Sequence, residues 1–303
     1  MSSDAGRPAP PAASSSPAPR GEGRIVVVGA ALLELRFTVE HLPTAGDDVL
    51  ARGLEVRVGG SAVNVARTLK GLGLASLLVI HRGEGPFDRM VGRELARLGL
   101  RVQGRRSRRR SGVTVTLVEP SGERSLVSAL GVEVSVGALD LPRDVGRARA
   151  LYVSGYELAA SEDLEAAVAA LPPRVLVLMD PGPRGARPGA VGRAWARADV
   201  VRLNAREAAE RSGEPDPEAA ARELGRRRPT VVSTPEGAFA ADQDGVRFVA
   251  AGRRSTGDTT GAGDAHAAGL LAGLLSGLDL AGATALANQV AREQVLAGER
   301  QDW

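Results

Sequence analysis

The chain has 303 residues, of which 43% are hydrophobic, so it is long enough to bury the core of one large domain or two smaller ones. It contains no cysteine, which excludes disulfides, thiol nucleophiles and thiolate metal sites. Its formal net charge is only +3, and no apolar run approaches the ~20 residues that span a bilayer. We therefore expect a soluble, cytoplasmic protein without a nucleic acid or membrane partner.

Residues 1–23 are dominated by Pro, Ala, Ser and Gly and show no hydrophobic period. A segment of this composition cannot bury enough apolar surface to fold, so we predict a disordered tail. Residues 24–303 are predicted to form the folded domain.

From residue 24 onward, short β-branched runs alternate with helical patterns. This order is typical of a doubly wound α/β fold, in which a mostly parallel sheet carries helices on both faces. The predicted strands cover residues 25–28, 77–80, 151–153, 175–179, 200–203 and 230–233. The predicted helices cover residues 62–72, 89–98, 163–171, 206–211 and 218–226.

Two segments, at about 33–58 and 112–128, alternate in the manner of strands with no helix inside them. Residues 119–123 read Glu-Pro-Ser-Gly-Glu, which is typical of a hairpin turn. We therefore predict a small β-sheet that projects from the main sheet.

Gly59 and Gly60 stand directly before the first predicted helix, and Asn64 follows within its first turn. Glycines let the backbone approach a ligand closely, and an asparagine amide both donates to and accepts from a pair of hydroxyls. This pattern predicts a substrate contact. The structural alternative is a Gly-rich helix entry with Asn64 facing solvent.

Five arginines between residues 105 and 110 form the one local basic patch of the sequence. Such a patch is able to bind a phosphorylated ligand or nucleic acid, but no aromatic residue lies among the arginines to stack on bases. We therefore predict a solvated strand edge or loop.

Asn204 and Glu207 stand at the start of the helix predicted at 206–211. Asn followed three residues later by Glu is a capping box, which has an ordinary structural explanation. The same spacing puts Glu207 one turn further on the same side, where a carboxylate acting through water suits magnesium. The residues alone leave both interpretations open.

Residues 256–264 read Thr-Gly-Asp-Thr-Thr-Gly-Ala-Gly-Asp and precede a run rich in Ala, Gly and Leu. We predict that residues 261–264 form the first turn of a buried helix, whose unpaired N–H groups and dipole favour an anion. A carboxylate directly after such an anion hole is able to take the proton of a hydroxyl that attacks phosphorus. A tight turn capped by Asp264 is the structural alternative.

Residues 258–264 resemble the DTxGAGD signature of the ribokinase-like sugar kinases, the PfkB carbohydrate kinase family, and residues 59–66 resemble its GGxxxNxA segment. The resemblance covers nearly all of residues 24–297. It implies a ribokinase-like fold, with the small β-sheet as a lid over the sugar that often forms a dimer contact. It also implies that Asp264 is the catalytic base, that Gly261, Ala262 and Gly263 form the anion hole, and that Asp258 and Thr260 bind a monovalent cation such as K+.

The same resemblance assigns the other candidate residues. Glu34 stands five residues after Gly29, where ribokinases carry a sugar-binding aspartate, and its extra methylene displaces the carboxylate by ~1.5 Å, so the substrate need not be ribose. The implied substrate-binding residues are Glu34, Gly59, Gly60 and Asn64. The implied ATP-binding residues are Asn204, Glu207, Thr234, Gly237, Thr259, Gly261 and Gly263, and among them Glu207 holds Mg2+ through water.

Two positions depart from the family's pattern. Pro235 stands in the nucleotide-binding turn where a glycine is usual, and it removes a backbone donor. His266 replaces an aromatic residue two positions after the base. Its imidazole either tunes Asp264 or fills the packing position of the aromatic ring.

The expected function is an ATP- and magnesium-dependent phosphotransferase that phosphorylates a hydroxyl of a sugar or sugar-like substrate. A nucleoside such as adenosine is the alternative substrate. A non-catalytic sugar or nucleotide sensor is the alternative from another class. The lid predicts a homodimer.

Overall fold

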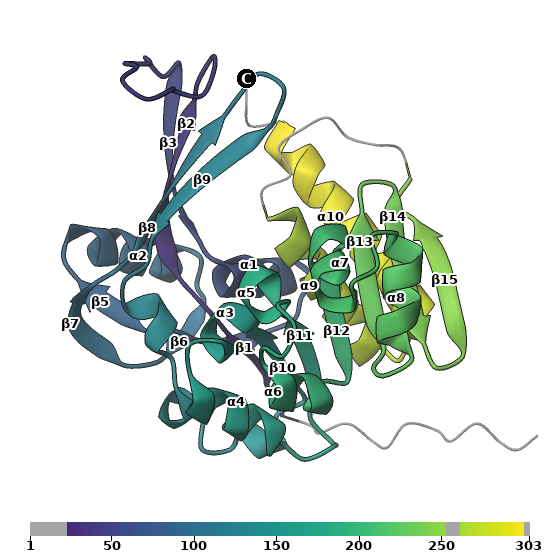
Figure 1. The fold of residues 1–303 in the computed structure, drawn as a ribbon. Coiled ribbons are helices and arrows are strands. Elements are labelled where there is room, and N and C mark those ends of the chain that lie inside the picture. The colour runs from purple at the N-terminus through teal and green to yellow at the C-terminus, as the bar shows by residue number, and fades with distance from the viewer. Residues whose placement is uncertain (1–22, 253–260, 300–303) are drawn as a thin grey trace, which may run out of the picture.

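The computed structural model describes residues 23–252 and 261–299, so most of the predicted tail lies outside the described residues. The described part forms a large sheet flanked by helices and a smaller sheet that projects from it (Figure 1). The large sheet has the strand order β15-β14-β13-β12-β11-β10-β1-β4-β6. Its strands are β1 (Ile25–Val28), β4 (Ser76–Val79), β6 (Arg101–Gln103), β10 (Ala150–Ser154), β11 (Leu176–Asp180), β12 (Val200–Asn204), β13 (Thr230–Thr234), β14 (Gly237–Asp242) and β15 (Gly245–Ala250).

The seven strands from β6 to β13 pair in parallel, and β14 and β15 are added in antiparallel orientation at one edge. All six predicted strands are present, and none of their ends is displaced by more than one residue. The strands that the sequence analysis did not predict lie at the two edges of the sheet. Strand β6 has three residues and β14 is rich in Ala and Gly, so these two lack a β-branched signal, whereas β15 contains Val246, Phe248 and Val249 and was missed although these residues favour a strand.

The five predicted helices are confirmed as α1, α2, α4, α7 and α8. Among the described residues, no helix is both long and apolar enough to cross a membrane. The α-helices are α1 (Ser61–Gly71), α2 (Pro86–Arg97), α3 (Gly155–Leu158), α4 (Glu162–Ala169), α5 (Gly182–Gly185), α6 (Gly192–Arg197), α7 (Ala205–Ser212), α8 (Pro217–Gly225), α9 (Ala262–Leu275) and α10 (Leu280–Glu299). Short 3-10 helices span Val132–Ser135, Ala138–Asp140 and Val145–Arg147.

The central strands are buried on both faces. On β1, Val27 packs into a core that includes Leu270 of α9, whereas Val26 and Val28 pack into a second core that includes Leu164 of α4. A strand covered on both sides reads as a continuous hydrophobic run rather than an alternating one, which explains its sequence. The doubly wound arrangement with helices on both faces is therefore confirmed.

The smaller sheet is the predicted lid, and its strands follow the order β3-β2-β8-β9. It is mixed, because β2 and β8 pair in parallel while the outer pairs are antiparallel. The hairpin between β8 and β9 closes with a hydrogen bond of 3.0 Å from the Glu119 N–H to the Glu123 carbonyl. The lid strands are β2 (Leu32–Thr38), β3 (Gly53–Gly59), β8 (Val113–Val118) and β9 (Arg124–Ala129).

The arginine cluster lies on a short strand, as predicted. Strand β7 (Arg106–Arg110) pairs in parallel with β5 (Arg82–Glu84) and is largely exposed. Arg106 forms an ion pair of 2.7 Å with Asp88, and neighbouring Arg105 forms one of 2.8 Å with Asp140. Part of the cluster is therefore paired with acidic residues of the chain itself.

Candidate active site

The two glycine-rich motifs, which lie far apart in the sequence, meet in the structure. Asp264 is in the first turn of α9, and the Nδ2 of Asn64 on α1 donates a hydrogen bond of 2.8 Å to its Oδ2. Gly60, directly before α1, has φ +102°, and a Cβ on it would lie 2.4 Å from the Ala30 carbonyl oxygen. A glycine is therefore needed for α1 to begin this close to the chain that follows β1. The glycine at this position therefore sets where Asn64 stands relative to Asp264.

The first turn of α9 has the form expected of an anion site. Gly261 has φ +75° and precedes the helix, and its carbonyl accepts the N–H of Ala265 at 2.8 Å. The N–H groups at the start of a helix have no acceptor within the helix, so those of Ala262 and Gly263 are available to a ligand. Asp264 follows them directly, as the proposed roles require.

The raised pKa of Asp264 suits a general base. Burial raises the pKa of its carboxyl from 3.8 to about 7, and nearby Asp180 adds to this shift. The hydrogen bond from Asn64 and the positive charges of Arg202 and Arg67 act in the opposite direction. A base whose pKa lies near 7 accepts a proton readily at neutral pH without being permanently protonated.

Arg202 is a site residue that the sequence analysis missed. It projects from β12, is only 7% exposed, donates from Nη1 to Asp180 Oδ2 at 3.2 Å and donates from Nη2 to Ser233 Oγ at 2.8 Å. A Cβ on Gly263 would lie 3.1 Å from Nη1, so the guanidinium packs against the proposed anion hole. A single charge between Val201 and Leu203, inside the buried strand β12, was the signal that pointed to it.

The charges around Arg202 hold it ionised. Burial lowers the pKa of its guanidinium, but Asp180, Glu207 and Asp264 outweigh burial, so the net shift is upward. One buried cation therefore lies within the field of three carboxylates. This excess of negative charge fits a site that receives a divalent cation.

Asn204 and Glu207 form the capping box of α7. The Asn204 Oδ1 accepts the Glu207 N–H, and Glu207 Oε2 accepts the Asn204 N–H, both at 2.9 Å. Burial, followed by repulsion from Asp180, raises the pKa of Glu207 to about 7. A magnesium ion with its waters would relieve that repulsion, so the residues fit the metal, and the metal-binding role stays a prediction.

Glu34 lies at the base of the lid. Its Oε1 accepts a hydrogen bond of 2.9 Å from Thr116 Oγ1. Its Oε2 lies against the backbone of Gly59, where a Cβ would approach it to 2.9 Å. Gly59 therefore leaves room for this carboxylate between the lid and the start of α1, and the sugar-binding role of these residues stays a prediction.

The predicted nucleotide turn is a tight hairpin between β13 and β14, in which Thr234 pairs with Gly237 and only Pro235 and Glu236 intervene. The Thr234 hydroxyl accepts the Glu236 N–H and donates to the Gly237 carbonyl, both at 3.3 Å. Both hydrogen bonds of this hydroxyl are therefore made within the turn and stabilise it. The other predicted residues on the nucleotide and cation side, Asp258, Thr259 and Thr260, lie outside the described residues.

His266 is buried in a structural network. Its Nε2 lies 3.2 Å from Asn288 Oδ1, and Asn288 Nδ2 donates to the Val249 carbonyl at 2.8 Å. Burial, together with the charge of Arg202, lowers the pKa of His266 to about 3, so the ring is neutral at physiological pH. Its position favours the packing interpretation, because it ties α9 to α10 and β15.

Comparison with solved structures shows a ribokinase-like fold. Ribokinase from Thermotoga maritima superimposes with a TM-score of 0.77 at 19% identity, over 90% of this chain and 92% of that one. Adenosine kinase from Sinorhizobium meliloti gives a TM-score of 0.74 at 21% identity, over 90% and 94%. Arabidopsis thaliana ribokinase complexed with ribose and ATP gives 0.76 at 19% identity, over 90% and 93%.

Sequence comparison identifies the family to which the chain belongs. The pfkB family carbohydrate kinase model matches residues 22–302. The uncharacterised sugar kinase YegV of Escherichia coli is 35% identical over 286 residues, which are 88% of this chain and 87% of the relative. The ATP-dependent ribose-1-phosphate kinase of Halopiger xanaduensis is 30% identical over 279 residues, or 88% and 89%. The chain therefore belongs to the PfkB family of carbohydrate kinases, which are ATP-dependent enzymes.

Proposed function

We propose that this kinase transfers the terminal phosphoryl group of ATP to a hydroxyl of a sugar or sugar-like acceptor, with Asp264 as the catalytic base. The observation that carries the proposal is the hydrogen bond between Asn64 and Asp264 at the start of α9. It joins a group suited to bind hydroxyls, a base with a pKa of about 7 and a helix N-terminus suited to a phosphoryl group.

In the proposed reaction, Asp264 takes the proton of the acceptor hydroxyl as its oxygen forms a bond to phosphorus. The bond between phosphorus and the leaving oxygen of ADP breaks on the opposite side. The N–H groups of Gly261, Ala262 and Gly263 stabilise the charge on the transferring group, and backbone donors of this kind supply much of the catalysis. Magnesium, held through water near Glu207 and Asp180, would neutralise charge on the ATP phosphates.

The identity of the acceptor is open to three alternatives. Glu34 and Asn64 suit the hydroxyls of a free sugar. The adenosine kinase with the same fold suggests a nucleoside as the acceptor. The relative named as a ribose-1-phosphate kinase suggests a phosphorylated sugar. A non-catalytic sensor is the alternative from another class, and the paired Asn64 and Asp264 argue against it.

The first test measures ADP release with ATP and Mg2+ on a panel of ribose, adenosine, ribose 1-phosphate and other sugars. We expect at least one acceptor to raise turnover well above the ATPase background, because the proposed base Asp264 directly follows the proposed anion hole at the start of α9. The same panel is followed by thermal shift. Ligands that raise the melting temperature without any turnover would support the sensor instead and contradict the kinase proposal.

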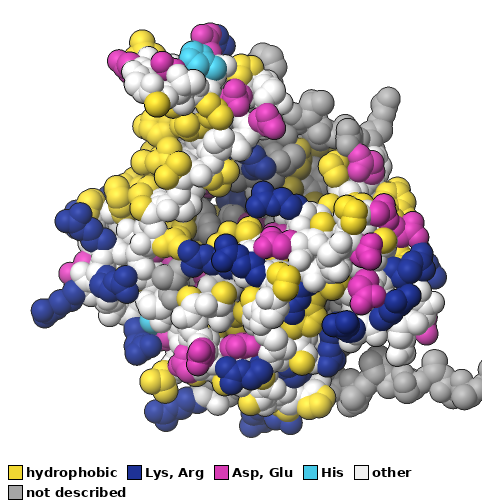
Figure 2. Space-filling model, in the orientation of Figure 1, with side chains coloured by type: hydrophobic (Ala, Val, Ile, Leu, Met, Phe, Trp, Pro, Cys, Tyr) yellow, Lys and Arg dark blue, Asp and Glu magenta, His cyan; other side chains and the backbone are white. Residues whose placement is uncertain are grey.

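We also propose a homodimer through the lid. One face of the lid carries an apolar row that crosses all four strands, formed by Val56, Leu35, Val115 and Val127, which are neighbours in the strand register. Val56 is 43% exposed, Val127 is 70% exposed, and Leu54 on the same face is 58% exposed. Figure 2 shows hydrophobic side chains gathered along the lid. Leu35 and Val115, in the middle of the row, are half-buried, and Leu35 also packs against the main core. The exposed apolar side chains on the outer strands are the kind of surface that marks a protein interface.

Val127→Glu is expected to convert the proposed dimer into monomers, because it places a charge inside the buried contact. Light scattering after gel filtration should give about twice 31.3 kDa for the unaltered chain and about 31.3 kDa for the variant. Val102→Glu is the matched control, since Val102 is 39% exposed on β6, outside the lid. A monomeric unaltered chain, or a Val127→Glu variant that remains dimeric, contradicts this interface.

A further inference from the structure

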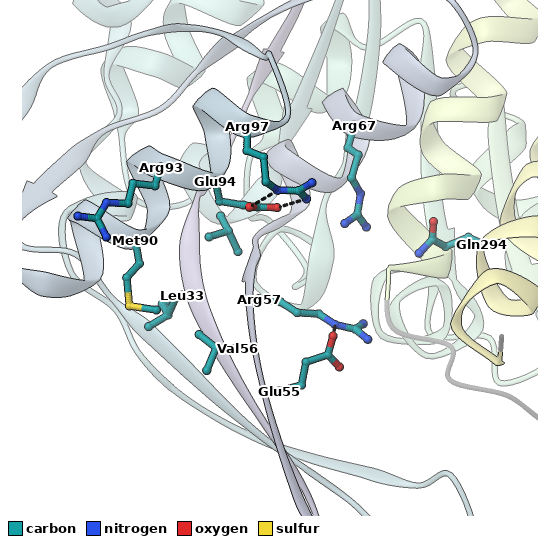
Figure 3. A pocket seen from close by; sticks show the side chains of 11 residues that line it. Leu33, Glu55, Val56, Arg57, Arg67, Met90, Arg93, Glu94, Arg97 and Gln294 are labelled. Atoms are coloured by element: carbon teal, nitrogen blue, oxygen red, sulfur yellow. Dashed lines mark hydrogen bonds and ion pairs between the residues drawn. The ribbon is translucent and has the colours of Figure 1, made fainter. Parts of the chain in front are cut away.

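A cavity of about 740 Å³ lies between the lid strand β3, helices α1 and α2, and the C-terminal part of α10 (Figure 3). Its charged lining is mostly basic: four arginines face two glutamates, a formal excess of two positive charges. We call this cavity the arginine pocket, and its charged residues are Arg57 on β3, Arg67 on α1, Arg93 and Arg97 on α2, Glu55 and Glu94.

The arginines of the pocket differ in their partners. Arg97 forms a two-pronged ion pair with Glu94, at 2.7 and 2.8 Å, and Arg57 pairs with Glu55. Arg67 makes no hydrogen bond or ion pair with any other described residue. In Figure 3 its guanidinium points into the space that Arg57 and Arg97 also face, whereas Arg93 points away.

The arginines also repel one another. The pKa of Arg67 is lowered by its partial removal from water and then by the charge of Arg57, with a smaller contribution from Arg97. Glu94 and Asp264 offset these effects only in part. An anion placed among the three guanidinium groups would remove this repulsion.

The arginine pocket adjoins the candidate active site on two sides. Arg67 follows Asn64 by three residues on α1, so both side chains project from the same face of the helix. Arg57 stands directly opposite Glu34 in the register of β2 and β3, so both belong to the same face of the lid. Glu34 and Asn64, the predicted sugar contacts with polar side chains, therefore each have a guanidinium as a neighbour.

We propose that the arginine pocket binds the phosphate group of the acceptor, so that the substrate is a phosphorylated sugar rather than a free sugar or a nucleoside. This inference rests on the proposed kinase function and specifies its substrate class. Without Arg93, the charged groups that face the shared space keep a formal excess of one positive charge, which attracts a phosphomonoester with its close to two negative charges at neutral pH. Arg67 supplies the unpaired guanidinium, and its planar fork suits two phosphate oxygens.

The test compares kcat/KM for ribose 1-phosphate and for ribose in the unaltered chain and in Arg67→Gln. We expect the unaltered chain to prefer the phosphorylated sugar. At a pH high enough to keep Asp264 deprotonated in both proteins, Arg67→Gln should lower kcat/KM for ribose 1-phosphate by about tenfold to a hundredfold, mainly through KM, and leave that for ribose nearly unchanged. Arg57→Gln should act in the same direction, and Arg67→Lys should restore part of the loss.

Arg89→Gln is the matched control, because Arg89 is exposed on α2 and does not line the pocket. It should leave both substrates unaffected. Calorimetric binding of ribose 1-phosphate without ATP tests the pocket even if no acceptor is turned over, which separates this inference from the kinase proposal. Equal losses for ribose and ribose 1-phosphate in Arg67→Gln overturn the inference. So does a preference for neutral acceptors, or activation of ribose turnover by inorganic phosphate, which would make the pocket an effector site.

Discussion

Asp264→Asn is expected to lower kcat by about 10²- to 10⁴-fold, which is the usual contribution of a positioned general base. The amide keeps the size of the side chain and can still contact Asn64, so the fold and the binding of the acceptor should change little. ADP release measures the loss of turnover, and calorimetry with the preferred acceptor measures the retained binding. A variant with nearly full turnover would remove Asp264 from the proposed mechanism.

The pH dependence of the unaltered chain provides an independent check on Asp264. Its pKa is raised from 3.8 to about 7, and the base works only when it is deprotonated. Activity should therefore be low in acid, rise through about pH 7 and level off above it. Asn64→Leu removes the hydrogen bond that lowers this pKa, so the rise should move to higher pH. A profile that stays in place would show that Asn64 does not act on this carboxyl.

Arg202→Met is expected to lower the free energy of unfolding by about 3–5 kcal/mol, which is typical when one partner of a buried ion pair is removed. The substitution leaves Asp180 buried opposite an apolar side chain and takes away the cation that also offsets Glu207 and Asp264. Urea denaturation at pH 7 measures the loss.

Two further variants make the Arg202 measurement specific. Arg222→Met breaks an exposed pair with Glu218 on α8 and should cost less than about 1 kcal/mol. Arg202→Met combined with Asp180→Leu removes both charges, so it should regain part of the stability lost in the single variant. If Arg202→Met proves no more harmful than Arg222→Met, the buried cation does not hold these carboxylates together.

The elements that were predicted correctly are those whose local sequence pattern matches their burial in the fold. The buried parallel strands are β-branched runs, and the glycine-rich starts of α1 and α9 are visible as motifs, so their positions were correct. Strand β14, next to the edge strand β15, lacks such a signal because most of its residues are small. Helix α10 was also not predicted, although it packs against α9.

The site was predicted in part for the same reason. Asn64 and Asp264 were each identified from their own motif, and the structure shows that they touch. Arg202 and Arg67 belong to no motif, and their environment depends on residues that only the fold brings near them. Glu207 shows a further limit, since one local pattern serves a capping box and a metal site equally well.

Side chains alternate between the two faces of the lid, so a single strand register determines both the proposed acceptor contacts and the proposed contact between subunits. Glu34 and Arg57 face one side of the sheet, and Leu35 and Val56, one residue along each strand, face the other. A slip of one residue would exchange these sets, so that charges would enter the proposed contact between subunits and apolar groups would meet the proposed acceptor. In the proposed dimer, assembly would therefore select chains with the correct lid register, because a misregistered lid would lose the partner subunit as well as the substrate.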